Sequence, residues 1–407
     1  MKTNNNIPAY RFQGYTDAWD LRKLGEIFQV SSGQTPSRQD EENFSSPDVP
    51  WVKTLDLTNS AILESEEFIS NKASQKLKLF PNGTVLIAMY GGINQIGRTG
   101  LLTFPSTINQ AISALPPSDE ILPYYLIYHL NSKIGVWRSL AASSRKDPNI
   151  TKTDVENFKI SFPALPEQEA IGTFFSTLDQ QITLHQRKLD TLKEQKKTYL
   201  KLLFPAKGQT KPALRFQGFE DDWEEVKLGE VLKERNVQQL PQEDTPLVSF
   251  TVENGVTPKT DRYDREFLVR TGDKKYKYTE LDDIVYNPAN LKFGAISRNK
   301  FGKAVFSPIY VTLVVNKSKV FANFIEGIVT KRDFIQEALQ FQEGTVYERM
   351  AVKVSDFLLM KISLPTLPEQ EAIGTFFQTL DQEIAQVEDK LASLKEMKKT
   401  LLRKLFV

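Results

Sequence analysis

The 407-residue sequence contains no cysteine. This absence excludes disulfides, thiolate metal sites and cysteine nucleophiles, and it indicates a reducing compartment. Histidine is nearly absent as well, because His129 and His185 are the only two, and they show no metal-ligand spacing. The sequence also lacks a run of about 18 apolar residues, and its start, MKTNNNIPAY, has no signal-peptide character. We expect a soluble, cytoplasmic protein without a membrane segment.

Familiar catalytic motifs are missing too. There is no GxxxxGK[ST] loop for nucleotide hydrolysis, and residues 91–97 do not match the dinucleotide fingerprint. Residues 286–289 (YNPA) superficially resemble the catalytic tetrapeptide of amino-methyltransferases, but they lack its second proline and its aromatic residue. We expect no catalytic residue, no metal and no cofactor in this chain, and binding is the better hypothesis. An enzyme with an unrecognised site is the alternative.

What the sequence does contain is a long internal repeat. Residues 165–204 return at 367–406 with 27 identical residues in 40 aligned positions. In both copies the seam residues alternate at steps of four and three, which is the heptad pattern of a coiled coil. The seam positions are Ile171, Phe175, Leu178, Ile182, His185, Leu189, Leu192, Lys196, Tyr199 and Leu203, then Ile373, Phe377, Leu380, Ile384, Val387, Leu391, Leu394, Lys398, Leu401 and Leu405.

Each copy predicts one helix of roughly 55 Å. Both open with Leu-Pro-Glu-Gln-Glu, where proline suits the first helical position. We predict that the two helices pair within the chain, because one molecule carries both partners. Pairing between two chains, and two unpaired amphipathic helices on separate cores, are the alternatives. His185 lies on the seam, where a polar residue can set the register, whereas His129 is expected in a core.

The repeat extends beyond the helices. Residues 11–28 (RFQGYTDAWDLRKLGEIF) and 215–232 (RFQGFEDDWEEVKLGEVL) share Arg-Phe-Gln-Gly, a tryptophan and Lys-Leu-Gly-Glu. Between these shared ends the two halves diverge almost completely. We predict domains at 1–164 and 206–366, and spacer helices at 165–205 and 367–407. Both domains are expected to mix helices and strands, with strands at 83–90 and 283–287 and helices from 123 past Trp137 and within 323–341, where Asp333 is a plausible cap.

Charge is distributed unevenly although the formal net charge is only +1. Residues 68–118 and 284–325 contain no Asp or Glu, but each segment holds several Lys and Arg residues. The two segments occupy similar places in the two halves. They predict surfaces that face phosphate groups, with ordinary sheet core as the alternative.

Taken together, the chain resembles the specificity subunit of type I restriction-modification systems. The resemblance rests on two variable domains alternating with two near-identical helices, on the Leu-Pro-Glu-Gln-Glu-Ala-Ile helix starts, and on the Trp and Lys-Leu-Gly domain starts. It implies an α+β fold with two target-recognition domains, an internal pseudo-twofold repeat and an intramolecular antiparallel coiled coil. It also implies that each domain reads one half of a bipartite, asymmetric double-stranded DNA site, with the coiled coil as the spacer.

The resemblance further implies a non-catalytic subunit. Two modification (methyltransferase) subunits would dock on it, and two restriction (nuclease/motor) subunits would complete the assembly. S-adenosylmethionine, ATP and Mg²⁺ would then belong to those partners. A coiled-coil scaffold with two protein-binding modules is the rival to this reading, beside the single-chain DNA-modifying enzyme.

Base readout needs bidentate donors and acceptors on loops near a basic surface. Polar loop residues in both halves meet this description, and an ordinary solvated loop is the alternative for each. The candidates in the first domain are Tyr90, Gly91, Gly92, Asn94, Gln95, Arg98, Ser143, Ser144, Arg145, Lys146 and Asn149. Those in the second domain are Asn287, Asn290, Lys292, Phe293, Ser297, Arg298, Asn299, Lys300, Thr345, Tyr347 and Arg349.

Overall fold

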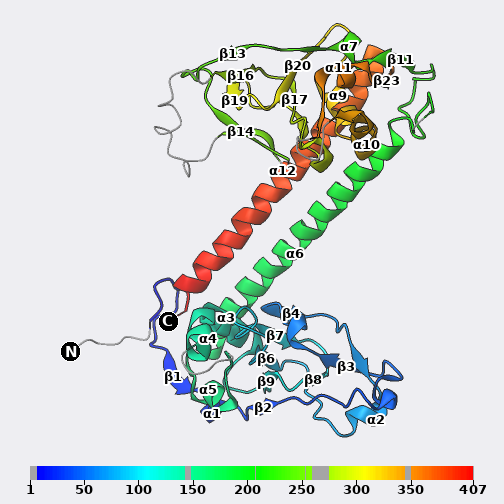
Figure 1. Cartoon of the computed structure of the whole chain (residues 1–407). Coiled ribbons are helices and arrows are strands. Elements are labelled where there is room, and N and C mark those ends of the chain that lie inside the picture. The colour runs from blue at the N-terminus through cyan, green and yellow to red at the C-terminus, as the bar shows by residue number, and fades with distance from the viewer. Residues whose placement is uncertain are drawn as a thin grey trace. The chain divides into compact units, whose positions relative to one another are not determined.

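The computed structural model describes residues 7–142, 148–206, 208–252, 254–258, 275–343 and 350–406. It divides into two units (Figure 1). Unit 1 is Met1–Arg187 with Asp389–Val407, and unit 2 is Lys188–Glu388. Each unit therefore combines one sequence-diverse domain with parts of both long helices. The domain bounds expected from sequence remain a prediction, because this division cuts across both helices.

The two repeat copies form helices α6 (Leu165–Leu202) and α12 (Leu367–Lys404), each 38 residues long. They run antiparallel to each other within both units (Figure 1). In unit 1 Asp179, early in α6, forms a 2.5 Å ion pair with Lys398, late in α12. In unit 2 Lys193 forms a 2.7 Å ion pair with Glu388. The predicted intramolecular pairing is confirmed.

The seam between α6 and α12 follows the predicted heptad positions. The seam residues are buried or half-buried along both helices. Its two lysines, Lys196 and Lys398, are ion-paired with Asp381 and Asp179, so the charge at each position is matched. His185 is half-buried, and its Nδ1 lies 2.8 Å from the carbonyl oxygen of Gln181.

The shared sequence outside the helices builds the same frame twice. Strand β1 (Asp20–Lys23) pairs antiparallel with β10 (Lys159–Phe162), and β11 (Glu224–Lys227) pairs with β23 (Lys361–Leu364) in the equivalent register. The Lys-Leu-Gly-Glu motifs open the short helices α1 (Leu24–Ile27) and α7 (Leu228–Val231). In each motif the Glu carboxylate accepts the backbone N–H of the Lys, at 3.2 Å in α1 and 2.9 Å in α7. This contact satisfies an N–H group at the helix start.

Arginines of the two Arg-Phe-Gln-Gly motifs hold the long helices to this frame. Arg11 donates two hydrogen bonds of 2.7 Å to Glu167, and Arg215 donates two of 2.7 Å to Glu369. The glutamate side chains are only 2% and 1% exposed. Each bidentate pair joins the arginine of an Arg-Phe-Gln-Gly motif to the first glutamate of a Leu-Pro-Glu-Gln-Glu motif, which explains why the two motifs occur together in each half.

The glutamine of each Leu-Pro-Glu-Gln-Glu motif fixes a second helix. The Gln168 side chain accepts the N–H of Leu122 at 2.9 Å and donates to the carbonyl of Pro163 at 2.8 Å. Gln370 accepts the N–H of Phe321 at 3.1 Å in the same way. Leu122 and Phe321 are the N-caps of α3 (Pro123–Ser132) and α9 (Ala322–Val329). The repeated helix start is thus a docking site for the first helix that packs on it.

A glycine lets α9 approach α12 closely. A Cβ atom built on Gly374 would lie 2.4 Å from Oδ1 of Asn323 in the first turn of α9. The equivalent Gly172 of α6 has the same relation to Tyr124 of α3, at 2.9 Å. Glycine is unfavourable inside a helix, so its presence at both positions is explained by this close packing.

Between the repeated ends, unit 1 carries sheets of its own. Within its described residues one sheet has the order β2-β9-β6-β7-β4, and another has the order β5-β3-β8. The bounds are β2 Ser31–Ser32, β3 Val49–Val52, β4 Ser60–Ile62, β5 Phe68–Ile69, β6 Val85–Ala88, β7 Thr99–Leu102, β8 Thr107–Ile108, β9 Ile112–Leu115, α2 Asn71–Ser74, α4 Ile134–Ala142 and α5 Lys152–Asn157. The strand predicted at 83–90 is confirmed as the buried β6. The helix predicted to run past Trp137 is broken at Lys133 into α3 and α4.

Unit 2 has a different arrangement. Its described strands form sheets of order β12-β20-β17-β18 and β13-β16-β19 and the pairs β14-β15 and β21-β22. The bounds are β12 Leu232–Glu234, β13 Gln238–Gln239, β14 Val248–Thr251, β15 Gly255–Pro258, β16 Tyr276–Thr279, β17 Ile284–Tyr286, β18 Ile296–Arg298, β19 Ala304–Phe306, β20 Val311–Val315, β21 Gln342–Glu343, β22 Ala351–Val352, α10 Arg332–Ala338 and α11 Val354–Leu359. The strand predicted at 283–287 is confirmed as β17. The proposed cap at Asp333 is wrong, because Lys331 is the N-cap of α10 and Asp333 lies in its first turn.

Tyr10, near the start of the described residues, contacts Lys404 at the C-terminal end of α12 in unit 1. The backbone N–H of Tyr10 donates to the carbonyl of Lys404 at 2.9 Å. In unit 2 the N–H of Leu214 donates to the carbonyl of Leu202 at the same distance, across the linker that follows α6. In each unit, the segment before the first strand thus contacts the C-terminal end of a long helix, α12 in unit 1 and α6 in unit 2. Within the described residues, no helix is long and apolar enough to cross a membrane.

His129 is buried in the core of unit 1, as expected from the sequence. Its ring packs on Phe406 with 5.4 Å between centroids, and Nδ1 lies 3.5 Å from the Tyr125 hydroxyl. Burial, with a smaller contribution from the Lys133 charge, lowers the pKa of His129 from 6.5 to about 3. The imidazole is therefore neutral in the folded protein across the physiological range.

The low pKa of His129 predicts a loss of stability in acid. Between about pH 6.5 and pH 3 the unfolded chain binds a proton at His129 that the folded chain does not, so stability falls as pH falls. At pH 5 this group should cost unit 1 about 2 kcal/mol relative to pH 8. Hydrogen exchange of α3 in urea at both pH values measures the difference, and His129→Leu should remove it. Equal pH dependence in the wild type and the variant would exclude His129 as the group.

Candidate nucleic-acid interface

The first candidate loop follows strand β6 in unit 1. Tyr90 is 41% exposed, and Gly91 and Gly92 have φ of 113° and 87°, which only glycine adopts without strain. A Cβ on Gly91 would lie 2.3 Å from Oε1 of Gln95, so the loop folds back on itself here. Asn94 is exposed at the tip, and its side-chain amide makes no hydrogen bond within the described residues. The loop thus presents an aromatic ring and a free amide.

Two arginines stand behind this loop. Nε of Arg98 donates to the carbonyl of Asn94 at 3.1 Å, and the Arg138 guanidinium donates to the same carbonyl at 3.3 Å. Arg138 comes from α4, and its Nε is buried without a hydrogen-bond partner. Neither arginine forms an ion pair within the described residues. Their charges are therefore available to an anion that approaches the loop.

The second candidate segment of unit 1 adjoins the first. The N–H of Ile150 donates to the carbonyl of Met89 at 3.1 Å. Asn149 precedes Ile150 and Tyr90 follows Met89, so this hydrogen bond joins the two segments. Asn149 itself is half-buried. Ser143, Ser144, Arg145 and Lys146 lie outside the described residues. The two segments that sequence reasoning picked separately come together at their described ends.

In unit 2 the equivalent loop follows β17. Asn287 is 5% exposed, and its Oδ1 accepts the N–H groups of Ala289 and Asn290 at 3.1 and 3.3 Å, so it shapes the turn. Asn290 is exposed, and its side chain makes no hydrogen bond within the described part of the chain. The Lys292 ammonium lies 5.0 Å from the centre of the Phe293 ring, which is 63% exposed. The exposed tip therefore carries an amide, a cation and an aromatic ring.

Farther along this loop, the basic residues are already paired. Arg298 donates to Glu326 at 3.0 Å and to Asp282 at 2.8 Å, and its side chain is 16% exposed. Burial alone would lower the pKa of Arg298, but the two carboxylates outweigh it and raise the pKa above its usual value. Lys300, which is more exposed, lies 3.1 Å from Glu326. Both carboxylates lie just outside the acid-free stretch of sequence.

Ser297 and Asn299 also serve the domain itself. Asn299 is fully buried, and its amide nitrogen donates to Thr279, Glu280 and Gly302 at 2.7 to 3.0 Å. The half-buried Ser297 hydroxyl donates to the carbonyl of Arg298 at 3.2 Å. In this structure both side chains stabilise the β18 turn and do not extend from it.

The last candidate segment of unit 2 repeats the arrangement seen in unit 1. Thr345, Tyr347 and Arg349 lie outside the described residues. The flanking strands β21 and β22 pair with each other, and the N–H of Val352 donates to the carbonyl of Pro288 at 3.3 Å. In unit 1 the segment before α5 is thus hydrogen-bonded to the residues after β6. In unit 2 the segment before α11 is hydrogen-bonded in the same way to the residues after β17.

This arrangement suits recognition of a polyanion by its surface groups. Exposed amides can bond base edges in a duplex groove, and arginine or lysine can bond guanine or phosphate. No group of three or more His, Asp or Glu side chains that could hold a metal lies within the described ranges. Arg138 was missed by sequence reasoning, because it sits on a helix about 40 residues after the loop and only the fold brings it there.

Comparison with known proteins gives a consistent picture. Residues 16–194 match the family model described as Type I restriction modification DNA specificity domain. The chain is 23% identical to the type I restriction enzyme MjaIX specificity subunit of Methanocaldococcus jannaschii, over 95% of this chain and 92% of that protein. It is 29% identical to the EcoR124I/EcoR124II specificity subunit of Escherichia coli, over 46% of this chain and 48% of that protein.

A solved structure shares the fold. The crystal structure of a type I restriction-modification system S subunit from M. genitalium matches with a TM-score of 0.66. The match covers 98% of this chain and 99% of that chain at 16% sequence identity. The similarity extends over both units and both long helices.

Proposed function

Because the chain belongs to the family of type I restriction-modification specificity subunits, we propose that it reads a two-part, asymmetric DNA sequence, one half with each unit. A specificity subunit is a non-catalytic component of its restriction enzyme. The activity of this chain is therefore recognition, and the chemistry is carried out by other subunits. Recognition of chromosomal DNA would agree with the cytoplasmic location expected from the sequence.

One observation supports the two-part reading above all. The same frame occurs twice, and each frame carries a different set of exposed loop residues at the same place. The place is marked by equivalent hydrogen bonds, Ile150 to Met89 in unit 1 and Val352 to Pro288 in unit 2. Equal placement favours equal roles, and unlike loops favour unlike half-sites.

The exposed loop residues suggest how the bases are read. Asn94 and Asn290 have free amides, which suit the N6 and N7 edge of adenine. Arg98 suits guanine or a backbone phosphate, as does Lys292. Tyr90 and Phe293 offer apolar faces to the groove. Asn287, Ser297, Asn299 and Arg298 would support these loops from within the domain.

The long helices complete the proposal. A paired helix is rigid, so it can hold two readers at a fixed separation, which a flexible linker cannot. The repeated outer surfaces of α6 and α12 can offer equal docking sites to two modification subunits, with two restriction subunits joining the assembly. S-adenosylmethionine, ATP and Mg²⁺ would be bound by those partners.

Replacing the two free amides tests the assignment of loops to half-sites. Asn94→Ala should relax base preference in one half-site, and Asn290→Ala should relax it in the other, each by about tenfold or more. Selection from a randomised duplex library by the chain with its modification subunits measures both preferences. Asn71→Ala, which removes an exposed amide on α2, is the control and should change neither. If both loop variants keep the wild-type preferences, these loops are not the readers.

A further inference from the structure

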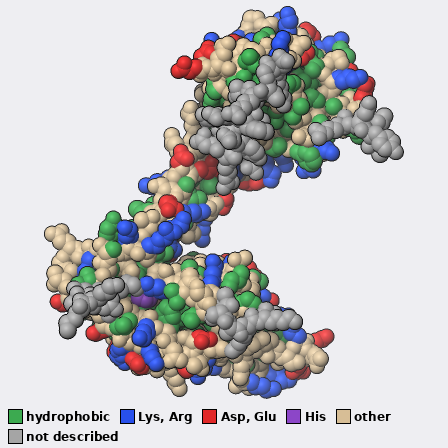
Figure 2. Space-filling model, turned by 60° about the vertical axis from the view of Figure 1, so that its left-hand side comes forward, with side chains coloured by type: hydrophobic (Ala, Val, Ile, Leu, Met, Phe, Trp, Pro, Cys, Tyr) green, Lys and Arg blue, Asp and Glu red, His purple; other side chains and the backbone are tan. Residues whose placement is uncertain are grey.

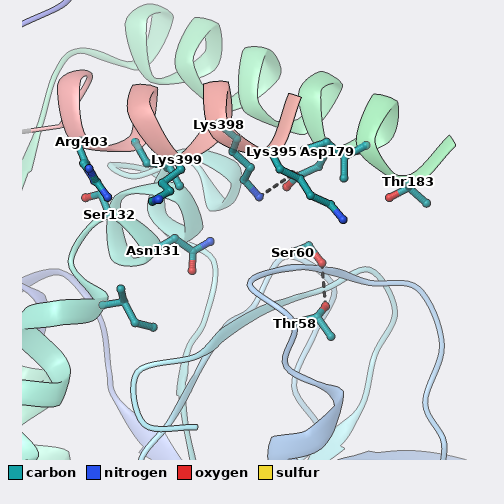
Figure 3. A pocket seen from close by; sticks show the side chains of 13 residues that line it. Thr58, Ser60, Asn131, Ser132, Asp179, Thr183, Lys395, Lys398, Lys399 and Arg403 are labelled. Atoms are coloured by element: carbon teal, nitrogen blue, oxygen red, sulfur yellow. Dashed lines mark hydrogen bonds and ion pairs between the residues drawn. The ribbon is translucent and has the colours of Figure 1, made fainter. Parts of the chain in front are cut away.

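A cavity of about 550 Å³ lies in unit 1 where the helix pair meets the first domain. Its helical wall carries the basic residues Lys395, Lys398, Lys399 and Arg403 of α12 (Figure 3). The facing wall carries Thr58 and Ser60 and the polar residues at the end of α3 (Figure 3). In Figure 2, Lys and Arg side chains gather on the helical part of unit 1 next to this domain.

Most of the positive charge in this wall is not neutralised across the helix pair. Lys398 is paired with Asp179 at 2.5 Å, but Lys395 is bonded only to the neutral amide of Gln186, at 3.3 Å. Arg403 makes no ion pair or hydrogen bond within the described residues. Lys399 is paired only with Glu396 on its own helix. The cavity therefore has a surplus of positive charge.

The equivalent place in unit 2 has one more of its lysines paired across the helix pair, although Lys197 pairs only with Glu194 of its own helix, as Lys399 does with Glu396. Lys193 stands where Lys395 stands in unit 1, but it is paired with Glu388 at 2.7 Å. Lys196 is paired with Asp381, as Lys398 is with Asp179. The repeat thus provides a glutamate in one copy where the other copy has Gln186.

The neutral groups of the cavity also suit a phosphate. Hydroxyls of Thr58, Ser60 and Thr183 line it, and those of Thr58 and Ser60 are hydrogen-bonded to each other at 2.9 Å. One hydroxyl of that pair, together with Thr183, can donate hydrogen bonds to oxyanions, whereas Ser132 already donates to the carbonyl of His129. The buried Asn131 in its wall accepts a 2.6 Å hydrogen bond from Thr99, the residue that follows Arg98. Asn131 thus connects the cavity wall to β7, the strand that begins directly after Arg98.

We propose that this cavity binds backbone phosphates of the DNA next to the half-site read by unit 1. The proposal rests on the proposed function and goes beyond it. It makes the two halves unequal: unit 1 contributes a salt-sensitive phosphate contact at the helix pair, and unit 2, where Glu388 neutralises Lys193, contributes less there. An acidic segment of a modification subunit is the competing occupant. The cluster of hydroxyls and the link to the Arg98 loop favour DNA.

Gln186→Glu is the sharpest test, because it installs in unit 1 the pair that unit 2 already has. It should reduce the slope of log affinity against log salt by about 1, and Lys395→Gln with Arg403→Gln should reduce it by about 2. The double variant should also weaken DNA binding about tenfold at low salt, with unchanged base preference. The matched control is Lys193→Gln in unit 2, which removes a lysine already paired with Glu388 and should leave the slope nearly unchanged.

The readouts are salt-dependent DNA affinity of the full chain with its modification subunits, and assembly of that complex by native mass spectrometry. Duplexes with neutral methylphosphonates beside the first half-site should weaken the wild type and not the double variant. Equal slopes in wild type, Gln186→Glu and the double variant would overturn the phosphate site. Loss of assembly instead of DNA affinity would overturn it in favour of a protein partner. A wild-type complex that binds no DNA at all would instead contradict the proposed function.

Discussion

Arg11→Ala is expected to lower the free energy of unfolding of unit 1 by about 3 kcal/mol. The substitution leaves the Glu167 carboxylate, 2% exposed, without its bidentate partner. A buried charge without a partner is costly, whereas an exposed ion pair contributes little. Arg11 also ties the segment before β1 to the start of α6, so the loss should spread to the β1–β10 pair. Hydrogen exchange of β1 and β10 in the full chain measures it.

Because the ion pair is repeated in unit 2, the same substitution can be made there. Arg215→Ala removes the equivalent partner of Glu369 and should loosen β11 and β23 while β1 and β10 stay protected. Glu169→Gln is the matched control, because it changes an exposed charge two residues along the same helix and should cost less than about 0.5 kcal/mol. Uniform loosening of both units by either arginine variant would contradict the view that each pair serves its own unit.

Phe406→Ala should destabilise unit 1 by about 3 kcal/mol although the residue is next to the last in the chain. Phe406 is 5% exposed, and its ring centre lies 5.6 Å from that of Tyr125 and 5.8 Å from that of Phe175. Truncating a buried aromatic side chain removes its contacts and leaves a cavity. The C-terminal end of α12 would then lose its anchor in the core of the first domain.

Phe204→Ala is the equivalent change in unit 2, where the ring packs on Phe324 at 5.3 Å and on Phe377 at 6.0 Å. Each variant should lower the stability of its own unit, as followed by the hydrogen exchange of α3 or α9. Leu184→Ala, at a position 56% exposed, is the control and should change stability little. If Phe406→Ala leaves α3 as well protected as in the wild type, the end of the chain is not part of the core.

The helices and the frame could be predicted from the sequence because their signals are periodic or repeated. A heptad seam needs only the spacing of apolar residues, and the structure buries or half-buries Ile171, Leu189 and Leu394 as that spacing predicts. The contacts of Glu167 and Gln168 could not be predicted from the sequence. Their partners, Arg11 and Leu122, lie far away in sequence, and only the fold brings them within hydrogen-bonding distance.

The candidate site was harder because polar loop residues look alike in a sequence. Asn290 and Asn299 are both asparagines in the same loop region, yet one is exposed and the other is fully buried with five hydrogen-bond contacts. Arg298 lies in a stretch without acids, but Asp282 and Glu326 fold against it from outside that stretch. The local sequence composition shows neither whether a side chain is buried nor which residues of other helices and strands contact it.

One signal was present in the sequence and could have been used. Aligning the two helix copies sets Gln181 and Gln186 against Glu383 and Glu388. The structure shows what the difference does, because both glutamates form ion pairs with lysines of α6 in unit 2. Differences between repeat copies are thus as informative as identities where a charge faces a partner.

The most direct test of the central claim is a genome-wide map of methylated adenines in cells that express this chain with its modification subunit. A two-part reader predicts methylation within one asymmetric motif, made of two unlike half-sites separated by a fixed number of unspecified base pairs. Asn94→Ala and Asn290→Ala should each relax a different half of that motif. A single contiguous palindromic motif, or a motif unchanged when either unit is altered, would contradict the account.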